Sequence, residues 1–167
     1  MSILDLPTIS RIRRNHGLEH ATLTILSRRR PSLSLSGISS TGGFLIVGNV
    51  ETADLQTAAQ EALTRMNNGE QYLAVHPNCG TNMVTSGLIA GILSWLGMAG
   101  AKDNKEKCSR LPLVISLVTL SLIYSRPLGP IIQEKITTSG KPKGLQIIEI
   151  IPFSMGKLKI HRIVTTG

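Results

Sequence analysis

The feature that most limits how this chain can fold is a stretch of 25 residues, 77–101, without Asp, Glu, Lys or Arg. From Met83 onward it is rich in Leu, Ile, Gly and Ala. A helix rises about 1.5 Å per residue, so such a stretch can cross the roughly 30 Å of hydrocarbon in a bilayer. A second uncharged run of 15 residues, Leu111–Ser125, follows the charged segment Lys102–Arg110, which is expected to be a loop. The two runs predict a transmembrane helical hairpin over 83–132, with a buried helical pair in a globular domain as the alternative.

Composition and charge agree with a membrane setting and argue against a nucleic-acid-binding protein. Hydrophobic residues make up 41% of the chain but aromatic residues only 3%, so the apolar content is aliphatic. The formal charge of +8 divides into about +1 over 1–76, +2 over 102–110 and +5 over 126–167, which flanks the apolar part. Nucleic-acid binding usually combines a basic face with stacking aromatic residues or a known motif, and the chain offers neither. The expected partners are therefore membrane lipid and a membrane protein, and no nucleic acid.

The segment before the apolar stretch predicts a small mixed domain. Apolar spacing over Ser10–Arg30 indicates a helix with Ser10 as its N-cap, and Pro31 ends it. Alternation over 33–38 and the apolar run 44–47 predict a pair of strands across a Ser/Gly-rich connection. Thr52–Met66 carries the clearest amphipathic pattern, so a second helix is expected there.

Further strands are expected on both sides of the hairpin. Residues 72–75 read as a short buried strand that delivers His76 into a turn. Alternating runs over 144–152 and 157–164 predict a C-terminal β-hairpin, with His161 as a surface strand residue.

These elements give an α+β fold with three parts. An α+β domain over 1–82 precedes the membrane hairpin over 83–132, and the β segment over 133–167 is expected to pack on the first domain. No apolar segment of a secretory signal peptide follows the first arginines, so the main domain is expected in the cytoplasm. The positive-inside count is nearly balanced and does not by itself choose an orientation.

The first motif is H-G-L-E-H at 16–20. His16 and His20 are four residues apart, so on a helix both imidazoles lie on one face and can reach one ion. The order H-x-x-E-H is that of the inverted zinc peptidases, in which the glutamate is a general base, here Glu19. The alternative is an ordinary helix with two partly exposed histidines.

The second motif is H-P-N-C-G-T at 76–81. It places His76 and Cys79 three residues apart in a tight turn, where the two side chains can converge. Imidazole and thiolate are the ligands that zinc prefers, so the two motifs predict one divalent metal site. A competing interpretation makes Cys79 a nucleophile with His76 or His20 as its base.

The sequence leaves the role of such a metal open. Four protein ligands, three histidines and one cysteine, form a closed tetrahedron that is typical of structural zinc. If one ligand stands off, water can occupy the open position and Glu19 can accept its proton during hydrolysis. A membrane-anchored hydrolase and a non-enzymatic scaffold or assembly factor with a structural metal are therefore both expected classes, and neither comes with a substrate.

Three sequence blocks carry a resemblance to a known family. They are H-G-L-E-H-A-T at 16–22, H-P-N-C-G-T-N at 76–82 before an apolar helix, and Q-E-K-I-T-T-S-G-K-P at 133–142 followed by L-Q-I-I-E-I. In this order they resemble a family of bacterial membrane proteins described as predicted metal-dependent enzymes. The resemblance spans most of 15–150 and implies a site made of the residues His16, Glu19, His20, His76 and Cys79.

The chain also departs from that family. The family's counterpart motifs read H-G-A-E-H-K and H-P-R-C-G-T, whereas this chain has Ala21 and Asn78 at the two basic positions. It is shorter and has fewer apolar helices. Any substrate contact that those two basic side chains make in the family is absent here.

Overall fold

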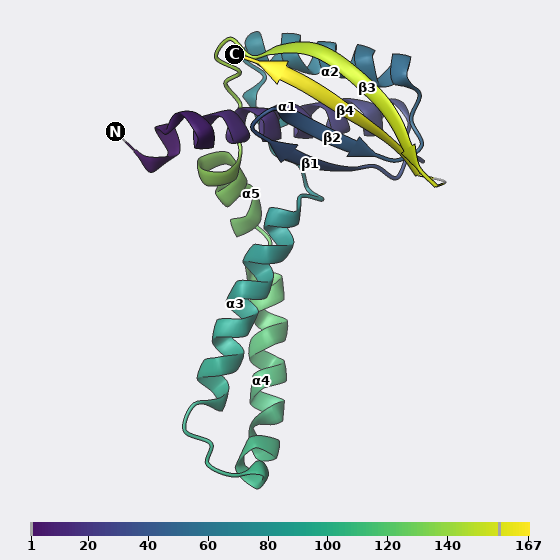
Figure 1. Ribbon diagram of the computed structural model, residues 1–167. Coiled ribbons are helices and arrows are strands. Elements are labelled where there is room, and N and C mark those ends of the chain that lie inside the picture. The colour runs from purple at the N-terminus through teal and green to yellow at the C-terminus, as the bar shows by residue number, and fades with distance from the viewer. Residues whose placement is uncertain (1, 157) are drawn as a thin grey trace. The chain divides into compact units, whose positions relative to one another are not determined.

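The computed structural model describes residues 2–156 and 158–167 and has an α+β fold. The chain divides into two compact units, one of Met1–His76 with Gln133–Gly167 and one of Pro77–Ile132. Figure 1 labels the five α-helices and four strands found in the described part of the chain.

The first long helix, α1 (Pro7–Arg29), follows a short 3-10 helix, η1 (Ile3–Asp5). It begins three residues earlier than predicted, with Pro7 in its first turn and no side-chain cap, so the predicted Ser10 cap is wrong. Proline suits the first helical position because its fixed φ is helical and its missing N–H has no partner there. The helix ends just before Pro31, as predicted.

One antiparallel sheet contains all four strands in the order β1-β2-β4-β3. The strands are β1 (Ser36–Ser40), β2 (Gly43–Val47), β3 (Gln146–Met155) and β4 (Leu158–Thr166). Ser40 pairs with Gly43, which leaves a two-residue turn and sets β1 two to three residues later than its alternating pattern suggests. The C-terminal hairpin is confirmed, with longer strands than predicted; Lys157, the predicted start of its second strand, lies outside the described residues.

The core lies between the sheet and two helices, α1 and α2 (Thr52–Asn67), and α2 covers the predicted segment. Its largest side chains include Leu18 and Leu26 from α1, Leu55 from α2 and Phe44 and Ile163 from paired strands.

A buried polar network fixes α1 on the sheet. Asn15 is fully buried and donates to the carbonyl of Ser40 at 2.8 Å, while Thr165 donates its hydroxyl to the Asn15 side chain at 2.7 Å. Satisfied buried polar groups of this kind fix orientation as well as contact.

The segment before His76 is a 3-10 helix, η2 (Gln71–Ala74), and the predicted strand there is wrong. Its amides bond three residues back, as Val75 does to Tyr72 at 3.1 Å. Four residues are too few for periodicity to separate a strand from a helical turn. Leu73 and Ala74 are nevertheless buried, so the segment that precedes His76 is buried as expected.

His161 is buried in β4 with 2% of its surface exposed, so its predicted surface position is wrong. It pairs with Ile46 and therefore faces the helices with the core residues. Its Nε2 lies 3.1 Å from the Thr52 hydroxyl at the start of α2. Burial, and secondarily the nearby Lys159 charge, lower the pKa of His161.

The second unit contains α3 (Gly80–Met98), α4 (Asn104–Tyr124) and the short α5 (Leu128–Ile132). The first two pack on each other through the bare backbone of Gly97, where a Cβ would lie 3.0 Å from a Val114 methyl. α4 starts earlier than predicted because Asp103 caps it by accepting from the Glu106 N–H at 2.8 Å. Most of Lys102–Arg110 is therefore helical rather than a loop.

By length and composition, α3 and α4 are each able to cross a membrane. Many of their large apolar side chains are exposed, among them Met83, Val84, Leu88 and Trp95 in α3 and Ile115 and Tyr124 in α4. The helical pair predicted from the two uncharged runs is thus present.

Candidate metal centre

The two histidines of the first motif meet on one face of α1. The ring centroids of His16 and His20 are 4.3 Å apart, with the rings inclined at 62°. Four residues make slightly more than one helical turn, which brings the two side chains together. His20 is buried and His16 is half-buried.

Both rings are oriented by backbone carbonyls. The Nδ1 of His16 lies 3.0 Å from the Thr137 oxygen, and the Nδ1 of His20 lies 2.8 Å from the Ala74 oxygen. A carbonyl only accepts, so each contact places a proton on Nδ1, and in the neutral ring the lone pair is then on Nε2. Metal-binding histidines usually have this arrangement, in which the second nitrogen donates to a carbonyl or carboxylate.

A third imidazole, His76, belongs to the same unit and follows η2. Its ring centroid is 5.8 Å from that of His20. Its backbone is held at both polar groups by the amide of Gln133: the His76 N–H donates to Oε1 at 2.9 Å, and Nε2 donates to the His76 carbonyl at 3.0 Å. Within this unit, His20 therefore neighbours both His16 and His76. These are three of the four predicted ligands.

Gln133 and Thr137 are supporting residues that motif reading did not assign. Gln133 is fully buried at the start of η3 (Gln133–Thr137), a single π-helical turn. Its carbonyl accepts from both the N–H and the hydroxyl of Thr138, at 2.8 and 2.9 Å. The Q-E-K-I-T-T block pointed to this region, but no spacing rule connects a glutamine to the backbone of a residue 57 positions away.

Glu19 is buried, with 3% of its surface exposed, and its carboxylate lies against β1. The Ser39 hydroxyl donates to its Oε2. Gly37 makes room for it, because a Cβ there would lie 2.2 Å from Glu19 Oε1. Glu19 is thus an internal carboxylate one residue before His20.

The segment carrying Thr137 is held against α1 at Gly17. A Cβ on Gly17 would lie 2.2 Å from the carbonyl oxygen of Ser139. The Ser139 N–H donates to the carbonyl of Arg13, one helical turn earlier, at 2.9 Å. The glycine inside H-G-L-E-H therefore permits the approach that brings the Thr137 carbonyl to His16.

Cys79 belongs to the other unit and is the N-cap of α3, where its sulfur accepts from the Thr81 N–H at 3.4 Å. Three residues of chain reach at most about 11 Å, so covalent connection alone keeps Cys79 near His76. His16, His20 and Cys79 are a candidate set of metal ligands.

Comparison with known proteins finds relatives of undescribed activity. Residues 11–150 match the family described as "Domain of unknown function (DUF6391)". An uncharacterized protein of the cyanobacterium Picosynechococcus sp. (strain ATCC 27264 / PCC 7002 / PR-6) is 42% identical over 153 residues, which cover 83% of this chain and 71% of that protein. No solved structure matches the chain.

Proposed function

The chain belongs to the family of the domain of unknown function DUF6391, and we propose that it is a membrane-anchored protein that binds one divalent metal ion, with zinc as the best fit. The proposed ligands are His16, His20, His76 and Cys79.

The orientation of the two α1 histidines is the observation that carries this proposal. Two adjacent rings both turn Nδ1 to a backbone carbonyl, at 3.0 Å for His16 and 2.8 Å for His20. This is the orientation in which metal-binding histidines are usually held, with Nε2 as the ligand atom. The resemblance to predicted metal-dependent membrane enzymes supports the same use.

The chemistry of the donors favours zinc. Imidazole nitrogen with thiolate sulfur suits Zn²⁺, whereas Mg²⁺ and Ca²⁺ prefer oxygen ligands. Three histidines and one cysteine complete a tetrahedron, and loss of any one ligand opens a position for water.

The membrane part of the proposal rests on α3 and α4. Cys79 caps the first turn of α3, so a bilayer crossed by α3 brings the ligand to the level of the headgroups.

Glu19 favours a metal-dependent hydrolase at the membrane surface over a protein that only binds the metal. Glu19 directly precedes the proposed ligand His20 in the chain and would act as the general base, and a bound metal would supply the acidity that activates water. The contrasting class is a scaffold or assembly factor in which the metal only joins α1 to the turn before α3. Replacement Glu19→Gln separates the two: with metal content and folding retained, loss of function supports the hydrolase, and full function in every assay supports the scaffold.

Elemental analysis of the full-length protein, purified in detergent, tests metal binding. We expect about one zinc per chain in the wild type, and loss of most of it in His16→Ala, His20→Ala and Cys79→Ala. His161→Gln is the matched control, since it removes a buried histidine that bonds Thr52 instead, and it should keep its metal. A folded wild-type protein without metal, even after incubation with Zn²⁺, would refute the proposal.

A further inference from the structure

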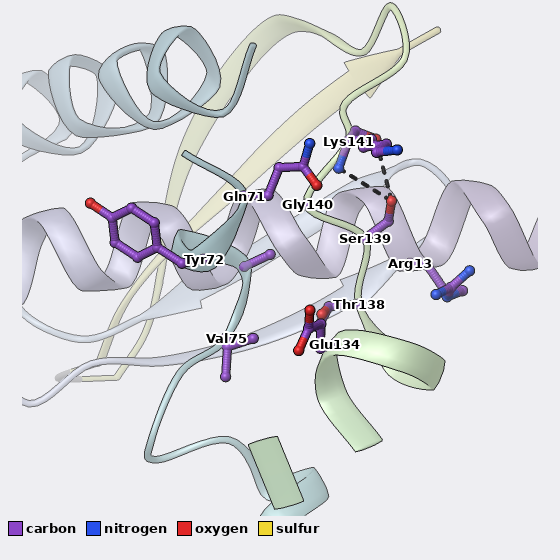
Figure 2. Close-up of a pocket in the computed structure, with 10 residues that line it drawn as sticks. Arg13, Gln71, Tyr72, Val75, Glu134, Thr138, Ser139, Gly140 and Lys141 are labelled. Carbon is purple, nitrogen blue, oxygen red and sulfur yellow. Dashed lines mark hydrogen bonds between the residues drawn. The ribbon is translucent and has the colours of Figure 1, made fainter. Parts of the chain in front are cut away.

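A second feature of the globular unit is a cavity of about 590 Å³. Figure 2 shows the side chains that line it, which come from α1, from η2 and the residue after it, and from Glu134 and the segment 138–141. Its volume is within the range of small-molecule sites, roughly 300–1,000 Å³. The proposed metal ligands are not among its lining residues, so it is a distinct site.

The cavity lining carries a net positive charge, from two cations and the carboxylate of Glu134. Arg13 and Lys141 line it, and neither forms an ion pair within 2–156 and 158–167. Other basic side chains of this unit, Arg29, Arg65 and Lys159 among them, are paired with carboxylates. Two unmatched cations on one cavity favour an anionic ligand.

Arg13 is only partly satisfied by the protein. One terminal nitrogen donates to the Lys135 carbonyl at 3.0 Å, whereas its Nε is buried and has no hydrogen-bond partner among the described residues. A guanidinium has five N–H donors, and its planar fork matches phosphate and carboxylate oxygens. An acceptor-rich ligand in the cavity could accept from the terminal N–H groups that the Lys135 carbonyl does not occupy.

The loop that carries Lys141 adds backbone to the cavity wall. Gly140 packs on η2, since a Cβ there would lie 2.6 Å from the Gln71 Cβ. Bare backbone therefore lines the cavity at this point. Ser139 is next to it, and its hydroxyl contacts both the N–H and the carbonyl of Lys141 at 3.4 Å, as the dashed lines in Figure 2 show.

We propose that this cavity binds the phosphate group of a small organic phosphate or of a lipid headgroup, between Arg13 and Lys141. A phosphate monoester carries a charge near −2 and three strong acceptor oxygens. It therefore suits two cationic side chains and their N–H donors better than a carboxylate does. Glu134 also lines the cavity, and its negative charge opposes the ligand.

The cavity and the histidine cluster share part of their walls. Ala74 lines the cavity, and its carbonyl orients His20. Thr138 lines it too and follows Thr137, whose carbonyl orients His16. Phosphate binding itself needs no metal, so it can be present whether or not the proposed metal function is correct.

The test uses the full-length protein in a non-ionic detergent, with and without prior chelation, and measures binding by calorimetry. The probes are glycerol 3-phosphate, short-chain phosphatidic acid, short-chain phosphatidylcholine and glycerate. Binding of glycerol 3-phosphate supports a soluble phosphate ligand, and binding of phosphatidic acid alone supports a lipid headgroup. Failure of both phosphate monoesters to bind, or equal binding of glycerate or of phosphatidylcholine, overturns the proposal.

Charge variants locate the binding site. Lys141→Gln should weaken binding of the phosphate probe about tenfold or more, as expected for a lost charged contact. Glu134→Gln should strengthen binding, because it removes a repelling charge. Lys143→Gln, which makes the same charge change two residues away and outside the cavity lining, is the control and should bind like the wild type. Equal effects of Lys141→Gln and Lys143→Gln would show general charge attraction and contradict the proposed site.

A variant of Arg13 that keeps the charge distinguishes lost binding from lost structure. Arg13→Lys keeps the charge but removes the fork, so we expect weaker phosphate binding with an unchanged unfolding transition. Binding as tight as that of the wild type would exclude the guanidinium from the site.

Discussion

Replacement of Gly17 by alanine is predicted to destabilise the globular unit, although the same change stabilises most helices. At an exposed helical position, Gly→Ala gains about 1 kcal/mol from helix propensity. At Gly17 the new Cβ would lie 2.2 Å from the Ser139 carbonyl oxygen, 3.0 Å from the Ser139 carbonyl carbon and 3.2 Å from the Ala74 Cβ. The oxygen is backbone, so the segment around Ser139 has to move away by close to 1 Å.

Two hydrogen bonds oppose that movement. They are the Ser139 N–H to the Arg13 carbonyl and the His16 ring to the Thr137 carbonyl. Overpacking costs about 1–3 kcal/mol, and weakening each hydrogen bond costs about 1 kcal/mol more. After subtracting the propensity gain, we expect a net loss of about 2–4 kcal/mol, or roughly 8–16 °C in the melting temperature at about 4 °C per kcal/mol for a domain of this size.

Thermal unfolding followed by circular dichroism in detergent measures this change. Gly69→Ala is a poor control because Gly69 has a positive φ, whereas Gly87→Ala in α3 adds a Cβ with no neighbouring atom within 4 Å. The Gly87 variant should melt at the wild-type temperature or above. A Gly17→Ala protein that also melts at or above the wild-type temperature would refute the claim that α1 and the Ser139 segment are in close backbone contact.

Three further predictions concern the supporting residues and the anchor. Gln133→Leu should reduce zinc content with little loss of helix, since His76 loses both of its backbone hydrogen bonds to the amide; unchanged metal content by elemental analysis would contradict that role. Burial and the nearby Lys159 lower the pKa of His161 in the folded state, partly offset by Glu51, so the unfolded chain takes up the proton first and stability should fall as pH drops below about 6.5. Urea unfolding at pH 7.5 and 5.5 should show a smaller loss in His161→Gln, and an equal loss would exclude His161 as the cause. The protein should stay in the membrane pellet after a carbonate wash, and its release would favour a soluble helical pair.

Local patterns predicted the helices and the hairpin because each depends on neighbouring residues. The amphipathic stripe of α2 and the uncharged run of α3 are properties of one segment, and both helices are present. The start of α4 was missed because an Asp103 cap outweighs the polar character of the residues after it. The position of β1 was shifted because a turn at 41–42, rather than the alternation before it, sets the pairing register.

Parts of the site could be predicted from sequence to the extent that its residues are close in the chain. The pairing of His16 with His20 follows from helical periodicity and is observed in the ring contact. The carbonyls of Ala74 and Thr137 and the amide of Gln133 could not be predicted, since backbone groups leave no signature in a side-chain pattern. The burial of His161 was missed because the face of a strand is set by its partner strands, and a Lys-Ile-His-Arg run fits either face.

The measurement that tests the central claim most directly is the absorption spectrum of the full-length protein after replacement of its metal with Co²⁺. A tetrahedral site that includes Cys79 should give visible cobalt bands together with a sulfur-to-cobalt charge-transfer band in the near ultraviolet. We predict that Cys79→Ser removes the charge-transfer band and that His16→Ala weakens both sets of bands, because the two motifs hold the same ion. A spectrum without a thiolate band, or bands that survive in His16→Ala unchanged, would contradict a single site built from both motifs.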